Sequence, residues 1–231
     1  MNLRNIEEAY LKGESLEEIR NLYISQIENI DESQQIEIWK QVCGYANEDM
    51  IAYLLSIGWR AAGVADSYDN TLLHLLATPI PSPTSYFIKN DKVYTCTQLL
   101  LDAKVSPLRK NDEEKTALIL SAQVGYNEML KAYYERNAKI DFTDRNGNTV
   151  LHLVALNFRT AYQQYEKATE DLDRHLNVKS DFPMSEEKFE HKKKVLEWNQ
   201  YVSRINVESF ITYAAMAMEF GIDPYQKNTE R

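Results

Sequence analysis

The stretch DRNGNTVLH at residues 144–152 decides the fold, because altered copies of it recur along the chain. The sequence DNTLLH occupies residues 69–74, and EKTALI occupies residues 114–119. Thr116 and Thr149 lie 33 residues apart, and each copy places a threonine directly before an apolar run. A fixed period of this length is typical of proteins built from stacked repeats. The sequence therefore predicts a repeat protein.

The segment 111–143 fills one such period and shows how a repeat is built. Thr116 is placed to cap a first helix, and Gly125 is placed to end it in the left-handed conformation. Residues 128–136 predict a second helix, and NAKID at 137–141 closes the unit. With these features the chain resembles the ankyrin-repeat protein family. The resemblance implies stacked helix pairs that hold another macromolecule on an extended surface.

We therefore expect an all-α solenoid of about four repeats that forms a single domain over residues 1–231. The expected parts are an N-terminal helical cap at 1–31, a degenerate repeat at 32–65, a repeat with a loop insertion at 66–110, a regular repeat at 111–143, and a repeat at 144–231 with a helical-hairpin insertion at about 159–207. In the second repeat, PIPSPT at 79–84 cannot continue a helix because of its three prolines, and SYFIKNDKVYT at 85–95 is compatible with a small β-hairpin.

The insertion in the last repeat has the composition of two antiparallel helices, at 160–177 and 185–220, with a break at 181–183. Its apolar residues are expected to pack inward: Phe189, Val195, Leu196, Trp198, Tyr201 and Val202. Among the tyrosines, Tyr133 and Tyr134 are expected in the core, whereas Tyr68, Tyr94 and Tyr126 fall on expected loops or turns.

Composition and charge narrow the class of partner. The 231 residues are 44% apolar and carry a formal net charge of -9, with a pI near 5.1. Nucleic acids and anionic membranes require a basic surface, so both are disfavoured as partners, and a protein with a basic segment fits better. Cys43 and Cys96 are too few for a disulfide framework, which favours a reducing compartment. We expect a cytoplasmic protein, or one delivered into a host cytosol, without a Sec-type signal peptide.

Chemistry-bearing motifs are missing from the sequence. It has no phosphate-binding glycine loop with a Walker lysine, no GxSxG, no HExxH and no paired CxxC. No catalytic, cofactor-binding or metal-binding residue is therefore predicted, and no cofactor. The resemblance implies that His74 and His152 tie neighbouring turns together by hydrogen bonds. His175 and His191 lie in the charged insertion and are expected to be solvated.

The resemblance also implies where a partner sits, because the turn tips and first helices of ankyrin-like stacks line a concave surface. Carried over position by position, it predicts ten partner-binding residues: Tyr68, Asn70, Asp112, Glu113, Lys115, Gln123, Arg145, Asn146, Asn148 and Asn157. The strip is polar and of mixed charge, which suits a protein loop or a basic segment.

We expect a monomeric, non-catalytic protein–protein interaction module, of which a specialised bacterial or viral effector or inhibitor is one form. Two alternatives stay open at this point. In one, the chain is an enzyme or enzyme regulator whose activity resides in the 159–207 insertion. In the other, the insertion makes it a self-associating structural component.

Overall fold

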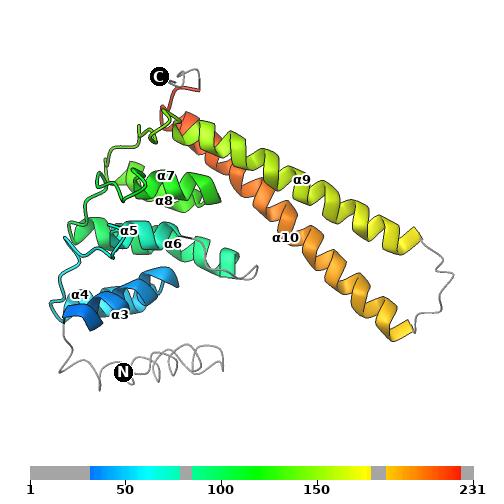
Figure 1. Cartoon of the computed structure of the whole chain (residues 1–231), viewed down its shortest axis with the longest axis horizontal. Helices are drawn as coiled ribbons and strands as arrows, with labels where there is room; N and C mark the ends of the chain where they lie inside the picture. The colour runs from blue at the N-terminus through cyan, green and yellow to red at the C-terminus, as the bar shows by residue number, and fades with distance from the viewer. Residues whose placement is uncertain (1–31, 79–84, 178–185, 225–231) are drawn as a thin grey trace.

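Helices make up the regular structure of this protein. The computed structural model describes residues 32–78, 85–177 and 186–224, which hold eight α-helices and no strand (Figure 1). They are α3 (Glu32–Gly44), α4 (Glu48–Ser56), α5 (Leu72–Ala77), α6 (Ser85–Asp102), α7 (Ala117–Val124), α8 (Asn127–Glu135), α9 (Val150–Asn177) and α10 (Glu186–Glu219). The all-α expectation is confirmed for these residues, and the expected cap at 1–31 lies outside them.

The helices pair along the chain, and the pairs stack on one another. Helix α5 packs between α3 and α7, while α6 packs between α4 and α8 (Figure 1). Helices α9 and α10 then cover α7 and α8 at the C-terminal end of the stack. One continuous apolar core joins all the pairs, and its largest fully buried side chains include Trp39, Leu72, Tyr133 and Tyr213. No described helix is both long enough and apolar enough to span a membrane.

The repeat at 111–143 folds as its sequence predicts. The Thr116 side chain accepts a hydrogen bond from the Ile119 amide, and Gly125 ends α7 at a φ of +80°. Helix α8 begins at Asn127 and ends at Glu135, one residue earlier at each end than predicted. Asn137 then takes a φ of +51°, a left-handed conformation that asparagine adopts more readily than most residues.

The β-hairpin considered for residues 85–95 is wrong. Ser85–Asp102 forms a single helix, α6, while residues 79–84 lie outside the described chain. The reason is visible in the second half of the segment, where Val93, Cys96 and Leu100 recur at three- and four-residue intervals and are all buried. That is the period of a helix and not of a strand. Tyr94, expected on a loop, therefore lies on α6.

The insertion in the last repeat lengthens two helices instead of adding separate ones. Helix α9 runs without interruption from Val150, directly after the repeat motif, to Asn177, so the expected start near residue 160 is wrong. Helix α10 occupies Glu186–Glu219, within a residue of the prediction at either end. The two pack against each other as a hairpin that projects from the stack (Figure 1). The expected break at 181–183 lies outside the described residues.

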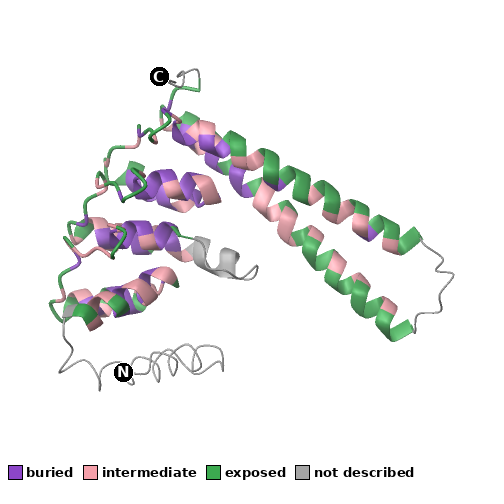
Figure 2. Ribbon diagram, in the orientation of Figure 1, coloured by how far each residue is buried: buried purple, intermediate pink, exposed green. Residues whose placement is uncertain are grey.

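Side chains are less buried the farther they lie from the stacked helix pairs. Buried side chains concentrate in the stacked pairs and at the base of the hairpin, and the outer hairpin is largely exposed (Figure 2). Of the six side chains expected to pack inward, Phe189, Leu196 and Val202 are half-buried, but Val195, Trp198 and Tyr201 are 45%, 46% and 45% exposed. Those three lie on the side of α10 that faces away from α9.

Two tyrosines also differ from expectation. Tyr126 is fully buried in the core, although a turn position had suggested exposure. Tyr134 is exposed, although its helical spacing had suggested the core; its ring stacks on Phe220 at a centroid distance of 3.9 Å. The contact of Tyr134 with Phe220 joins segments far apart in the chain, and the sequence of one repeat does not specify it.

Candidate functional site

Three turns of the same design precede α5, α7 and α9: the first turn (66–71), the second turn (111–116) and the third turn (144–149). Each begins with an Asp or Asn whose side-chain oxygen accepts two backbone N–H bonds from the residues two and four positions later. The six N···O distances lie between 2.8 and 3.1 Å. The leading residues are Asp66, Asn111 and Asp144. Local hydrogen bonding of this kind is why Asx residues favour turns.

The two aspartates hold their turns as ionised groups. Partial burial raises the pKa of Asp66, but hydrogen bonds from the side chain and backbone of Asn70 and from the backbone of Tyr68 outweigh it, so the pKa is lowered overall. The pKa of Asp144 is lowered in the same way, against burial, by Asn148 and Asn146, with a contribution from the charge of Lys115. Both carboxylates are therefore occupied with the backbone of their turns.

The fourth residue of each turn is left-handed. Asp69 and Glu114 both have a φ of +58°, and Gly147 has +77°. A left-handed residue with a β-carbon costs about 1–2 kcal/mol, and only glycine avoids it. The third turn therefore uses the residue type that the geometry favours, and the second turn, with Glu114, departs from it most.

The first and second turns are tied together. His74, fully buried, accepts a hydrogen bond at Nδ1 from the Thr71 amide at 3.1 Å, so its Nε2 carries the proton and donates to the Lys115 carbonyl at 2.9 Å. The Asp112 amide donates to the Tyr68 carbonyl at 3.0 Å. The Asn111 side chain donates to that of Asn70 at 2.8 Å, and Arg109 pairs with Asp69. The expected role of His74 is confirmed.

The second and third turns lack the same ties. Ile119 stands where His74 stands in the preceding repeat, and it has no ring nitrogen to donate. Arg145 occupies the position of Asp112, yet its amide makes no bond to the Glu113 carbonyl. His152 bonds within its own turn, to Thr149, and no further turn of this design follows it in the described residues, so the tie expected of His152 is wrong. The junction between the second and third turns is thus held by packing.

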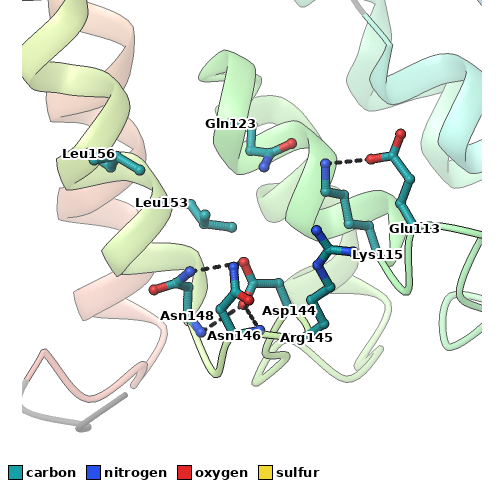
Figure 3. A pocket seen from close by; sticks show the side chains of 9 residues that line it. All are labelled: Glu113, Lys115, Gln123, Asp144, Arg145, Asn146, Asn148, Leu153 and Leu156. Atoms are coloured by element: carbon teal, nitrogen blue, oxygen red, sulfur yellow. Dashed lines mark hydrogen bonds and ion pairs between the residues drawn. The ribbon is translucent and has the colours of Figure 1, made fainter. Parts of the chain in front are cut away.

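A surface hollow of about 570 Å³ opens at this junction (Figure 3). Its lining comes from the second turn, α7, the third turn and the start of α9: Glu113, Lys115, Gln123, Asp144, Arg145, Asn146, Asn148, Leu153 and Leu156. Six of the ten residues predicted to bind a partner line it, namely Glu113, Lys115, Gln123, Arg145, Asn146 and Asn148. The structure brings these six together in one place.

Charges of both signs meet in the hollow. The Lys115 ammonium lies 2.6 Å from the Glu113 carboxylate, and Figure 3 shows this pair on the side of the hollow opposite α9. The hydrogen bond from Lys115, with the charges of Lys115 and Arg145, lowers the pKa of Glu113. On the α9 side, Leu153 is buried and Leu156 is 64% exposed, which adds an apolar wall.

The other four predicted residues lie outside the hollow. Tyr68 is 67% exposed on the first turn, and Asp112 is exposed on the second. Asn70 accepts the hydrogen bond from Asn111, which makes it part of the tie between turns. The Asn157 side chain donates to the Leu153 carbonyl of its own helix at 2.8 Å.

Sequence reasoning missed Asp144, Leu153 and Leu156 as lining residues. A signal for Leu156 was present, because it lies seven residues after Thr149, just as Gln123 lies seven residues after Thr116. Equivalent positions on successive first helices face the same surface. An exposed leucine was passed over because an apolar residue on a helix is usually assigned to the core.

The titratable groups of the hairpin do not form a metal site. The histidines in its projecting part are His175 and His191, while His152 lies at the start of α9. The His175 ring stacks on Phe189 at 4.4 Å and its Nε2 lies 3.2 Å from the Phe189 carbonyl, so it is half-buried and not solvated as expected, whereas His191 is exposed. Within residues 32–78, 85–177 and 186–224, no group of three or more His, Cys, Asp or Glu side chains could hold a metal ion.

Comparison with known proteins adds no relative. No protein-family model matches the chain, and no curated protein matches it. The turn geometry and the hollow are therefore the observations from which a function can be argued.

Proposed function

We propose that this chain is an ankyrin-type solenoid of about four repeats that binds a protein partner, without catalysis, on the surface formed by its three turns and by α5, α7 and α9. The 33-residue spacing, the threonine before each first helix and the three matching turns support this assignment. The bond of His74 to the next turn supports it further, since it fixes the repeats in a regular stack.

The observation that carries the binding proposal is the hollow at the untied junction. Side chains in the hollow and beside it have interaction capacity that the chain itself does not use. Arg145 in the hollow, and Asp112 and Glu114 on the second turn outside its lining, are exposed and form no ion pair with any residue in the described ranges. Leu156 presents an apolar side chain beside them. A partner segment that fits this surface would place a basic residue against the acids of the second turn and an apolar residue against Leu156.

The acids in the hollow support a binding role over a catalytic one. A general base needs a carboxylate that is free to take a proton near neutral pH. Glu113 is engaged by Lys115, and Asp144 accepts three hydrogen bonds from its own turn. The pKa of each is lowered, the opposite of what proton transfer at neutral pH requires.

The proposal is tested by capture from cell extract on the immobilised full chain. The test variant combines Glu113→Lys with Arg145→Glu, which reverses two charges of the hollow and leaves the net charge at -9. The matched control combines Lys167→Glu with Asp173→Lys, two exposed residues of α9 far from the hollow. We expect a protein that wild type and control retain and the test variant loses. Equal capture by all three chains would show that this surface is not the binding site.

A further inference from the structure

Helix α10 carries a second apolar face, on the side away from α9. The face toward α9 is formed by residues at heptad spacing, including Phe189, Leu196, Val207 and Phe210, all buried or half-buried. The face away from α9, which we call the outer face, consists of Val195, Trp198 and Tyr201, which are exposed, and of Val202 and Ile205, which are half-buried. Val195, Trp198, Val202 and Ile205 follow one another at intervals of three, four and three residues, which is again the spacing of a helix–helix contact.

The outer face continues a contact that is already made at the base of the hairpin. Ser209 and Met216 extend the line of Val195 and Val202 at seven-residue steps. Ser209 is buried, and the Met216 sulfur lies 3.7 Å from the Asn127 amide nitrogen on α8. Farther out the hairpin leaves the stack and is largely exposed (Figure 2). Val195, Trp198 and Tyr201 lie in this part of α10 and are exposed. An apolar face of this kind on a projecting element is typical of an interaction site.

The sequence of the outer face is complementary to itself. If a second α10 is laid antiparallel across it, with the two-fold axis at the level of Gln200, whose own side chain donates to Thr169 on α9, Val195 faces Ile205 and Trp198 faces Val202. At the edge of such a contact, Lys194 lies opposite Glu208, and by symmetry this pair of opposite charges occurs twice; within its own helix the Glu208 carboxylate lies 3.6 Å from Arg204 Nε, so Lys194 would join that pair. Asn199 and Tyr201 then lie close to their own copies at the axis. A parallel arrangement would instead place Lys194 opposite Asn199, which offers no opposite charge.

We propose that the hairpins of two copies of this chain pair through the outer faces of α10, antiparallel, to form a symmetric dimer. The strip from Lys192 to Glu208 is about 25 Å long at the rise of an α-helix. A contact of that length is small for a protein interface, so the dimer dissociates on dilution. This arrangement differs from the monomer expected of a simple binding module, and it leaves the hollow at the turns open in both copies.

The test is sedimentation velocity of the full chain over about 5 to 500 µM, the range in which small interfaces associate. We expect the weight-average mass to rise toward that of a dimer. Trp198→Glu should raise the dissociation constant at least about tenfold, because a charge would be buried at the centre of the contact. Leu176→Glu is the matched control, since Leu176 is 48% exposed but lies on α9, and it should leave the association unchanged.

A charge exchange tests the register without removing an apolar side chain. Lys194→Glu alone and Glu208→Lys alone should each weaken the dimer by placing like charges together, and the double exchange should restore it. Asn199→Cys should form an intermolecular disulfide under mild oxidation, whereas Leu176→Cys should not; the native Cys43 and Cys96 are both buried. Far-UV circular dichroism checks that each variant keeps its helices.

Three results would overturn the proposal. The first is a mass that stays monomeric at every concentration. The second is association that Trp198→Glu and Lys194→Glu leave unchanged, because the chain would then associate through another surface. The third is a double exchange that fails to restore what the single exchanges remove, which would contradict the antiparallel register.

Discussion

Replacing His74 tests the tie that holds the first and second turns together. In His74→Leu the buried side chain keeps a similar size, but the Thr71 amide and the Lys115 carbonyl lose their ring partners. Each buried polar group left without a partner costs about 1–3 kcal/mol, and burial of leucine offsets part of that. We expect the free energy of unfolding to fall by about 2–4 kcal/mol near neutral pH, measured by urea denaturation with circular dichroism.

The effect should depend on pH, with a sign that the structure fixes. Burial lowers the pKa of His74 below its ordinary value of 6.5, although the bond to Lys115 and the charges of Asp69 and Asp66 oppose the shift. The unfolded chain therefore binds this proton more readily than the folded one. The stability contributed by neutral His74 is complete above pH 6.5 and is lost as the pH falls toward the lowered pKa. The difference in free energy of unfolding between wild type and His74→Leu should therefore narrow as the pH falls.

The control is Ile119→Leu, at the matching position of the next repeat, where no ring bond exists to be lost. This swap of similar volume should cost less than about 1.5 kcal/mol, with no dependence on pH in the same range. The reasoning about the tie would be refuted if His74→Leu were as stable as wild type near neutral pH. A loss of stability of the same size on both sides of pH 6.5 would refute the part that concerns protonation.

Three further predictions concern single groups in the repeats. Tyr213→Phe should lower the free energy of unfolding by about 1 kcal/mol, because the Tyr213 hydroxyl bonds to Ser121 on α7. Tyr133→Phe should leave it unchanged or raise it, because the buried Tyr133 hydroxyl has no partner in the described chain; thermal unfolding of the two variants tests this. Glu114→Gly should stabilise by up to about 1 kcal/mol by relieving the left-handed conformation, while Asp69→Gly, at the same φ, should gain less because it loses the pair with Arg109. Asp144→Ala should lower the free energy of unfolding, measured by chemical denaturation, by about 1–3 kcal/mol, and Asp144→Asn should lower it less. The extra stability that the aspartate gives over asparagine should be complete above pH 3.8 and disappear as the pH falls through the lowered pKa of Asp144.

Local signals in the sequence predicted the local structure well. The capping of α7 by Thr116, its end at Gly125 and the tie made by His74 each depend on a residue type at one position of a repeat, and the structure confirms all three. The ends of α10 were predicted to within a residue, because Pro183 precedes it and Gly221 follows it.

What sequence could not predict depends on contacts between distant segments. The start of α9 was misplaced because no residue between Leu151 and Arg159 breaks a helix, and only the fold shows that the repeat helix and the insertion are one. Trp198 was assigned to the interior because helical spacing identifies an apolar face but not what covers it. The missing tie was predictable, because Ile119 stands in the place of a tying histidine, but the hollow is a property of the junction between two turns, and its lining became apparent only in the fold.

Helix α9 is unbroken, so a tilt at one end of the helix moves its other end. One rigid helix carries Leu156 at the hollow and Leu176 near the far end of the hairpin, about 30 Å away at 1.5 Å per residue. A tilt of about 5° at the hollow would move the far end by about 3 Å, with no hinge between them to absorb it. Binding of a partner in the hollow and the position of the far end of the hairpin are in this way geometrically linked.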